Sequence, residues 1–189
     1  SLFAQTPVQV VIGPTAGTGS WFYGPIFRNT TNAGTLNYSR YAYLYTASEL
    51  NIPSGARIVK VEWLKKDGGT IAAPNTFNVW MMNTTSATLP STAAWSTVVS
   101  GATQTYASTT FALSANANEY VSAPFNVPGS DSFTYTGGNL QILTDWGKFG
   151  TQTNAGINFY ILTATGKGIG LASSAALTGA STLQTTTYG

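Results

Sequence analysis

Residues 57–66, which read Arg-Ile-Val-Lys-Val-Glu-Trp-Leu-Lys-Lys, decide the fold class. Apolar and polar side chains alternate along this stretch, so that Val61 and Trp63 fall on one face while Lys60 and Glu62 fall on the other. A repeat of two residues, carried by β-branched and aromatic side chains, is typical of a β-strand with one buried face. We therefore expect a strand here.

The same alternation recurs on both sides of this stretch. It is found at residues 41–45, 77–82, 140–145 and 157–163. Turn-forming sequences rich in Gly, Pro, Asn and Asp separate the runs, for example Pro128–Asp131 and Gly137–Asn139. Strands and turns without long intervening helices are typical of all-β proteins. The sequence predicts an antiparallel, jelly-roll-like β-sandwich that forms a single domain over residues 5–189.

Three segments do not follow this alternation. Thr46–Leu50 is expected to form one helical turn, which Thr46 caps and which ends before Pro53. Residues 84–100 are rich in Ser, Thr and Ala and are expected to hold a long loop. The tail Leu171–Gly189 has only weak strand character.

The composition excludes several classes of protein. Only 7% of the 189 residues are charged, and the chain contains neither His nor Cys. A typical zinc site, a His-dependent triad, a thiol nucleophile and the usual haem or iron–sulfur ligands are therefore excluded. The eight dispersed basic residues make no nucleic-acid footprint. No apolar run approaches the roughly 18 residues of a membrane helix, so we expect no membrane insertion.

The first residues are similar to the end of a secretory signal. Residues 1–4 are mostly apolar and end in the small Ala4, so a cut before Gln5 would leave them as a remnant of the signal peptide. A sequence that begins at an arbitrary point explains them equally well. Low charge and abundant Thr, Ser, Asn and Gly are typical of extracellular surface proteins. We expect a secreted protein that works at the cell surface.

Two blocks of the chain resemble a recurring pattern of secreted bacterial surface proteins. The first lies in residues 40–58 and includes Tyr-Thr-Ala-Ser-Glu-Leu and Ile-Pro-Ser-Gly-Ala-Arg, and the second is Phe133–Leu140. Both are similar to blocks in Bacteroidetes proteins, including cargo of the type IX secretion system and adhesin-like proteins of gliding bacteria. The resemblance implies a jelly-roll-like sandwich that serves as a surface or substrate-binding module, usually without catalysis. It implies no ligand residues.

One uncharged segment near the start of the sequence has strand character. In residues 6–12 the side chains of Val8, Val10 and Ile12 fall on one face. Charge is a usual defence of sheet edges, and this chain has little of it. The segment either pairs within its own sheet or adds to the sheet of a neighbouring copy, which builds a filament if the contact does not close. Adhesion or structural self-assembly is therefore the first functional prediction.

Carbohydrate binding, as a module of a larger secreted protein, is the alternative prediction. Sugar rings stack on Trp and Tyr, while polar side chains orient the hydroxyl groups. The candidate residues lie beside Gly-rich segments or in an expected loop: Trp21, Tyr23, Asp145, Trp146 and Phe149. A sandwich core also needs aromatic side chains. The row Tyr41, Tyr43 and Tyr45 fits either a core face or a stripe that meets a partner.

The six acidic residues are the candidates for acid–base chemistry and for binding calcium. A glycoside hydrolase needs two of them facing each other across the scissile bond. Most of them lie in expected turns, caps or strands, so we predict no enzymatic activity. No Asp-rich calcium loop is present. Calcium held by backbone carbonyls and one or two acids stays open, with Asp131 and Asp145 as the candidates, and no other cofactor is expected.

Overall fold

The computed structural model describes residues 7–13, 16–17, 19–20, 24–26, 36–69, 71, 75–148 and 157–188. These residues form thirteen strands and two helices of four residues each. The strands are β1 (Gly19–Ser20), β2 (Tyr38–Tyr45), β3 (Arg57–Ile58), β4 (Lys60–Lys65), β5 (Asn75–Thr84), β6 (Thr92–Ala94), β7 (Thr103–Ser108), β8 (Glu119–Pro124), β9 (Phe133–Thr134), β10 (Asn139–Lys148), β11 (Phe159–Tyr160), β12 (Thr163–Ser173) and β13 (Thr182–Tyr188). The helices are α1 (Ala47–Leu50) and α2 (Trp95–Val98).

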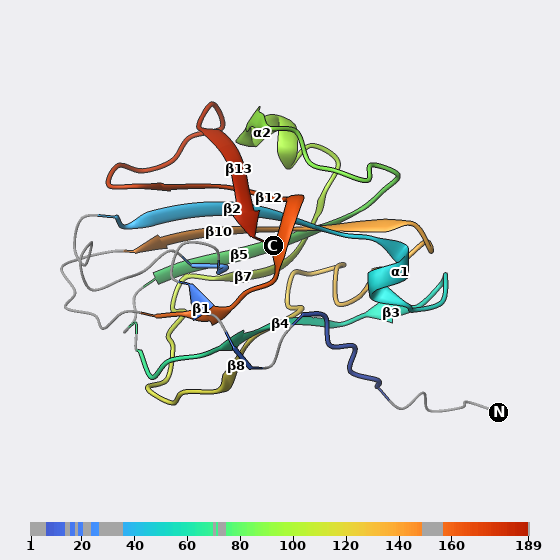
Figure 1. Ribbon diagram of the computed structural model, residues 1–189, viewed down its shortest axis with the longest axis horizontal. Helices are drawn as coiled ribbons and strands as arrows, with labels where there is room; N and C mark the ends of the chain where they lie inside the picture. The colour runs from blue at the N-terminus through green and yellow to red at the C-terminus, as the bar shows by residue number, and fades with distance from the viewer. Residues whose placement is uncertain are drawn as a thin grey trace.

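Two antiparallel sheets lie one over the other (Figure 1). The larger sheet has the strand order β6-β13-β12-β2-β10-β5-β7, and the smaller sheet has the order β1-β11-β4-β8. Strands β3 and β9 pair separately. The chain crosses repeatedly between the sheets, since β4 is followed by β5, and β10 by β11. The prediction of an all-β antiparallel sandwich is confirmed.

The main core fills the space between the two sheets. Phe77 on β5 is fully buried, and the centre of its ring lies 4.6 Å from that of Phe111 and 5.9 Å from that of Trp63 on β4. Trp146 on β10 and Phe159 on β11 belong to the same buried cluster. Because these residues come from both sheets, their packing holds the two layers together.

The other face of the larger sheet is buried as well. The chain between β5 and β7 contains β6 and α2, and α2 lies over this face (Figure 1). The second cluster consists of Ala42, Leu44, Leu89, Trp95, Val98, Leu143, Ile169 and Leu183. Trp95 of α2 packs edge-on against Trp80 of β5, with 5.7 Å between ring centres. The central strands of the larger sheet are therefore covered on both sides.

The tyrosine row of β2 belongs to the interior. Tyr41 and Tyr43 are each 3% exposed, and their rings stack with centres 6.0 Å apart. Gly170 on β12 makes room for this row, because a β-carbon there would lie 2.1 Å from the Tyr41 ring. Burial raises the pKa of Tyr43 well above its ordinary value and, with a smaller effect of the Glu49 charge, raises the pKa of Tyr45 to about 12. The row is a core face rather than an exposed stripe.

The expected helical turn is confirmed, the weak strand character of the tail corresponds to a strand, and two other local expectations are wrong. The Thr46 side chain accepts a hydrogen bond from the Glu49 N–H, and the Glu49 carboxylate accepts one from the Thr46 N–H, which caps α1. Residues 84–100 are not one long loop, because they contain β6 and α2. The tail includes the well-formed strand β13, and β10 runs to Lys148 where a loop was expected. These segments form strands because they pair with neighbouring strands, although the alternation of apolar and polar side chains in their own sequences is weak.

Leu183→Ala tests whether the second cluster is a true core. Leu183 on β13 is fully buried there, so its truncation should lower the free energy of unfolding by about 2–5 kcal/mol. Leu162→Ala is the matched control, because Leu162 is 43% exposed and the same change should cost less than about 0.5 kcal/mol. Urea unfolding followed by tryptophan fluorescence measures both changes. Equally small losses would show that this face of the sheet is not a core.

Candidate functional site

Residues 7–13, called the valine segment below, belong to no helix and no strand and lie outside the two sheets (Figure 1). Val8 is 85% exposed, Val10 is 43% exposed and Val11 is 53% exposed. Ile12 is half-buried and packs against the main core, so it anchors one end of the segment to the domain. One of the two predicted outcomes was that the segment pairs within a sheet of its own chain. The structure does not show this pairing.

Of the residues predicted to bind sugar, the structure describes two and places them on opposite faces of β10. Trp146 is fully buried in the main core, so neither face of its indole ring is open to a sugar. Asp145 points the other way, because consecutive strand residues alternate between faces. Trp21, Tyr23 and Phe149 lie outside the described residues.

Asp145 is held by Arg40 of the neighbouring strand β2. Nη2 of Arg40 donates to Oδ2 of Asp145 at 3.1 Å and to the carbonyl of Leu177 at 3.3 Å, and Nη1 donates to the carbonyl of Thr178 at 2.6 Å. The guanidinium carbon lies 4.9 Å from the centre of the Trp95 ring. Only 10% of the Arg40 side chain is exposed. This cluster joins β2, β10, α2 and the loop before β13, and it gives Asp145 a structural role.

The other five acidic side chains also have partners. They are Glu49 with Thr46 and Lys167, Glu62 with Lys60 and Ser122, Asp67 with Asn158, Glu119 with Ser114, and Asp131 with Arg57. The hydrogen bonds from Thr46, with a smaller contribution from Lys167, lower the pKa of Glu49. Within the described part of the chain, no three acidic residues gather where they could hold a metal ion. Both calcium candidates, Asp131 and Asp145, already face an arginine, and calcium binding stays a prediction.

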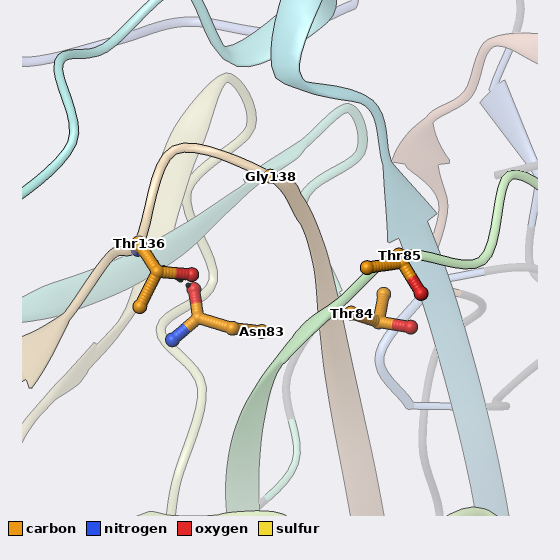
Figure 2. A pocket seen from close by; sticks show the side chains of 5 residues that line it. All are labelled: Asn83, Thr84, Thr85, Thr136 and Gly138. Atoms are coloured by element: carbon orange, nitrogen blue, oxygen red, sulfur yellow. Dashed lines mark hydrogen bonds between the residues drawn. The ribbon is translucent and has the colours of Figure 1, made fainter.

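An open hollow of about 530 Å³ lies where β5 ends and the loop before β10 passes (Figure 2). Its lining residues are Asn83, Thr84, Thr85, Thr136 and Gly138. The Asn83 side chain donates to the carbonyl of Thr134 at 2.9 Å and accepts from the N–H of Thr136 at 3.0 Å. Figure 2 shows Asn83 and Thr136 facing each other on one side of the hollow, with Thr84 and Thr85 on the other side. This lining carries hydroxyl and amide groups but neither an acid–base pair nor an aromatic ring.

Lys65 on β4 is a buried charge on the same face as Val61 and Trp63. It is 1% exposed, and its Nζ donates to the carbonyl of Gly69 at 3.0 Å and to that of Ser114. Burial lowers the pKa of Lys65, and the Glu119 carboxylate partly opposes this shift. The lysine therefore joins β4 to the segment before β8. The alternating pattern placed a lysine on an apolar face, which is the signal that could have identified it.

Sequence analysis missed a row of side chains that crosses the smaller sheet. Leu64 on β4 lies directly opposite Tyr120 on β8, and the register of β11 places Tyr160 on the other side of Leu64. Paired residues point to the same face, so these three form a row on the outer face, called the tyrosine platform below. Tyr120 is 37% exposed, and the hydroxyl of Tyr160 donates to Oδ1 of Asn118 at 2.8 Å. Only strand pairing brings these residues together.

Comparisons with protein-family models, with curated proteins and with solved structures found no match. Among the described residues, neither helix is long and apolar enough to cross a bilayer. Function is therefore inferred from the residues and contacts described above.

Asp145→Ala tests the structural role of the Arg40 cluster. Loss of the carboxylate leaves a buried guanidinium without its counter-charge, which should lower the free energy of unfolding by about 2–3 kcal/mol. This is less than the ~3–5 kcal/mol of a fully buried pair, because 24% of the Asp145 side chain is exposed. Asp131→Ala removes the other arginine-paired aspartate, whose side chain is 85% exposed, and should change stability by less than about 0.5 kcal/mol. Equal effects in thermal unfolding would contradict this role.

Proposed function

We propose that the protein is a non-catalytic, extracellular surface module that adheres or self-assembles through its valine segment. The observation that carries the proposal is the exposure of that segment, with Val8 at 85%, although the domain buries similar side chains completely in its two cores. Burial of one valine side chain stabilises by about 1.5–3 kcal/mol. The backbone groups of the segment gain ladder hydrogen bonds only by joining a sheet. A neighbouring copy offers both kinds of contact.

The state of the acidic side chains supports the non-catalytic part of the proposal. Each of them is bonded to a cation, a hydroxyl or an amide, so each has a structural task. The charged content of 7% and the two blocks that resemble Bacteroidetes surface proteins support a place outside the cell. Membership of that group and export by the type IX system remain predictions.

Val8→Asp combined with Val10→Asp should abolish self-association. A neighbouring sheet would have to bury two carboxylates in place of two apolar side chains, which is strongly unfavourable. Sedimentation velocity over a range of concentrations should show the wild-type mass growing with concentration while the double variant stays a monomer. Gln9→Asp is the matched control, because it adds a charge to the same segment on the opposite face, and it should associate like the wild type. A wild-type protein that stays monomeric up to its solubility limit would refute the proposal.

Carbohydrate binding is the second candidate function, and the tyrosine platform is the observation that favours it. Tyr120 and Tyr160 lie two strands apart, which is about 9.5 Å, with Leu64 between them. Aromatic rings that share one face of a sheet suit the C–H faces of successive sugar rings. The nearby Glu62 is paired with Lys60 at 3.0 Å, so this charge is balanced, which suits an uncharged polysaccharide.

Tyr120→Ala should weaken polysaccharide binding by about tenfold, equivalent to about 1.4 kcal/mol, because it removes one stacking ring. Tyr120→Phe keeps the ring and should bind like the wild type. Retention on insoluble cellulose and chitin, together with affinity electrophoresis in soluble glucans, measures both variants. Equal binding by the wild type and Tyr120→Ala, or no binding by the wild type, would remove this candidate.

A further inference from the structure

The described edge strands of the two sheets differ in how they are protected. Strands β1 and β6 are two and three residues long and offer little ladder to another chain. Strand β7 is six residues long, but Asn126 covers it. The Asn126 side chain donates to the carbonyl of Ala107 at 2.8 Å and accepts from its N–H at 2.9 Å, while the Asn126 N–H donates to the carbonyl of Thr105 at 3.0 Å. Asn126 thus acts as a strand partner one residue long and closes the edge of β7.

The edge of β8 is open by comparison. The N–H of Phe125, just after β8, donates to the carbonyl of Val59 at 3.0 Å, and hydrogen-bonded pairs alternate along an antiparallel ladder. In the register of β4 and β8, Phe125, Ala123 and Val121 are therefore the residues bonded to β4. The residues between them, Tyr120, Ser122 and Pro124, direct their backbone groups away from β4. Pro124 has no N–H, so this edge offers two N–H groups and three carbonyls. No described strand pairs with β8 on that side.

A groove follows the same strand. Its volume is about 210 Å³, and it lies between Glu119–Ser122 of β8 and the segment Phe111–Ser114. Its lining includes the apolar side chains of Phe111, Leu113 and Val121, each less than 9% exposed, and the buried Lys65. The rest of the lining is polar and includes Ser114, Glu119 and Ser122. An added strand with small β-branched side chains on one face fits such a groove, because its backbone pairs with the edge while alternate side chains enter the groove beside Leu113 and Val121.

The valine segment leaves the domain at the opposite side of the smaller sheet. A β-carbon on Gly13 would lie 3.9 Å from Cβ of Leu162, so the segment starts beside the residues that follow β11. Strand β4 separates β11 from β8. To reach its own β8, the segment would have to cross two strands, about 9.5 Å. The β8 edge of a neighbouring copy can be reached without this crossing.

We infer that the edge of β8 is the acceptor for the valine segment of a second copy of the chain. This inference rests on the proposed self-assembly and names the surface that it uses. Val8 and Val10 enter the groove, and Gln9 stays on the outer face. Because donor and acceptor lie at opposite sides of one sheet, the contact is heterologous and extends from copy to copy into a filament, rather than stopping at a twofold dimer.

Ser122→Pro in the full chain tests the acceptor. It removes an N–H that points away from β4 and places a ring on the open edge, where Pro124 shows that proline is accommodated. The apparent dissociation constant for association should rise at least about tenfold, since ladder bonds are lost and the approach is blocked. Ser122→Ala is the matched control, because it keeps the N–H and loses only the hydroxyl, and it should associate like the wild type. Thermal unfolding checks that both variants fold.

Mixing the variants separates this inference from the proposed function. Val8→Asp with Val10→Asp keeps the acceptor, and Ser122→Pro keeps the donor, so each alone should be monomeric while their mixture forms pairs that grow no further. If Ser122→Pro assembles like the wild type while the valine variant does not, the acceptor inference fails and the proposed function stands. If the valine variant assembles normally, both fail. A mixture that stays monomeric also overturns the inference.

Cross-linking keeps the test decisive if Ser122→Pro does not fold. The chain contains no cysteine, so each engineered thiol is unique. Chains carrying Gln9→Cys, mixed with chains carrying Tyr120→Cys under oxidising conditions, should form a mixed disulfide, because the proposed pairing places both residues on the outer face. In the control, chains carrying Ser130→Cys replace those carrying Tyr120→Cys, and no mixed disulfide should form. Equal yields from Tyr120→Cys and Ser130→Cys would overturn the inference.

Discussion

Burial of the larger sheet on both of its faces is the constraint on which the rest of the structure depends. Strand β10 shows it most clearly, since Ile142 packs in the main core while the next residue, Leu143, packs in the second cluster. A polar side chain on such a strand has to find a partner inside the protein. Arg40 and Asp145 meet this requirement for each other on the face that α2 covers. The two faces of the larger sheet therefore have room for few charged side chains.

Low charge also changes how the sheet edges are protected. Charged side chains usually discourage one sheet from pairing with another. Here β7 is closed by the backbone and side-chain amides of Asn126, whereas β8 is interrupted by Pro124 and borders a groove whose lining is partly apolar. An open edge and an exposed apolar segment in one molecule are complementary. The proposed self-association makes use of this complementarity.

The alternation of apolar and polar residues predicted β2, β4, β5 and β10, because a strand with one apolar face shows a repeat of two residues in its own sequence. It did not predict α2, since four residues are too short for a helical period and Trp95 lies in a segment of Ser, Thr and Ala. The burial of Trp146 and the tyrosine platform depend on which strands become neighbours. The absence of charge around Val8 and Val10 was readable in advance, but the open edge of β8 depends on the register with β4. Sequence thus indicated the proposed donor segment and not its proposed acceptor.

Amide hydrogen exchange of the valine segment, measured as a function of protein concentration, tests the central claim most directly. In dilute solution Val8, Gln9 and Val10 should exchange at rates close to those of an unstructured chain, because none of the described strands pairs with them. At concentrations where the protein assembles, these amides and those of Tyr120 and Ser122 should become protected together. Protection of the segment that is already present in dilute monomer, or exchange that stays fast in the assembled protein, would contradict the account.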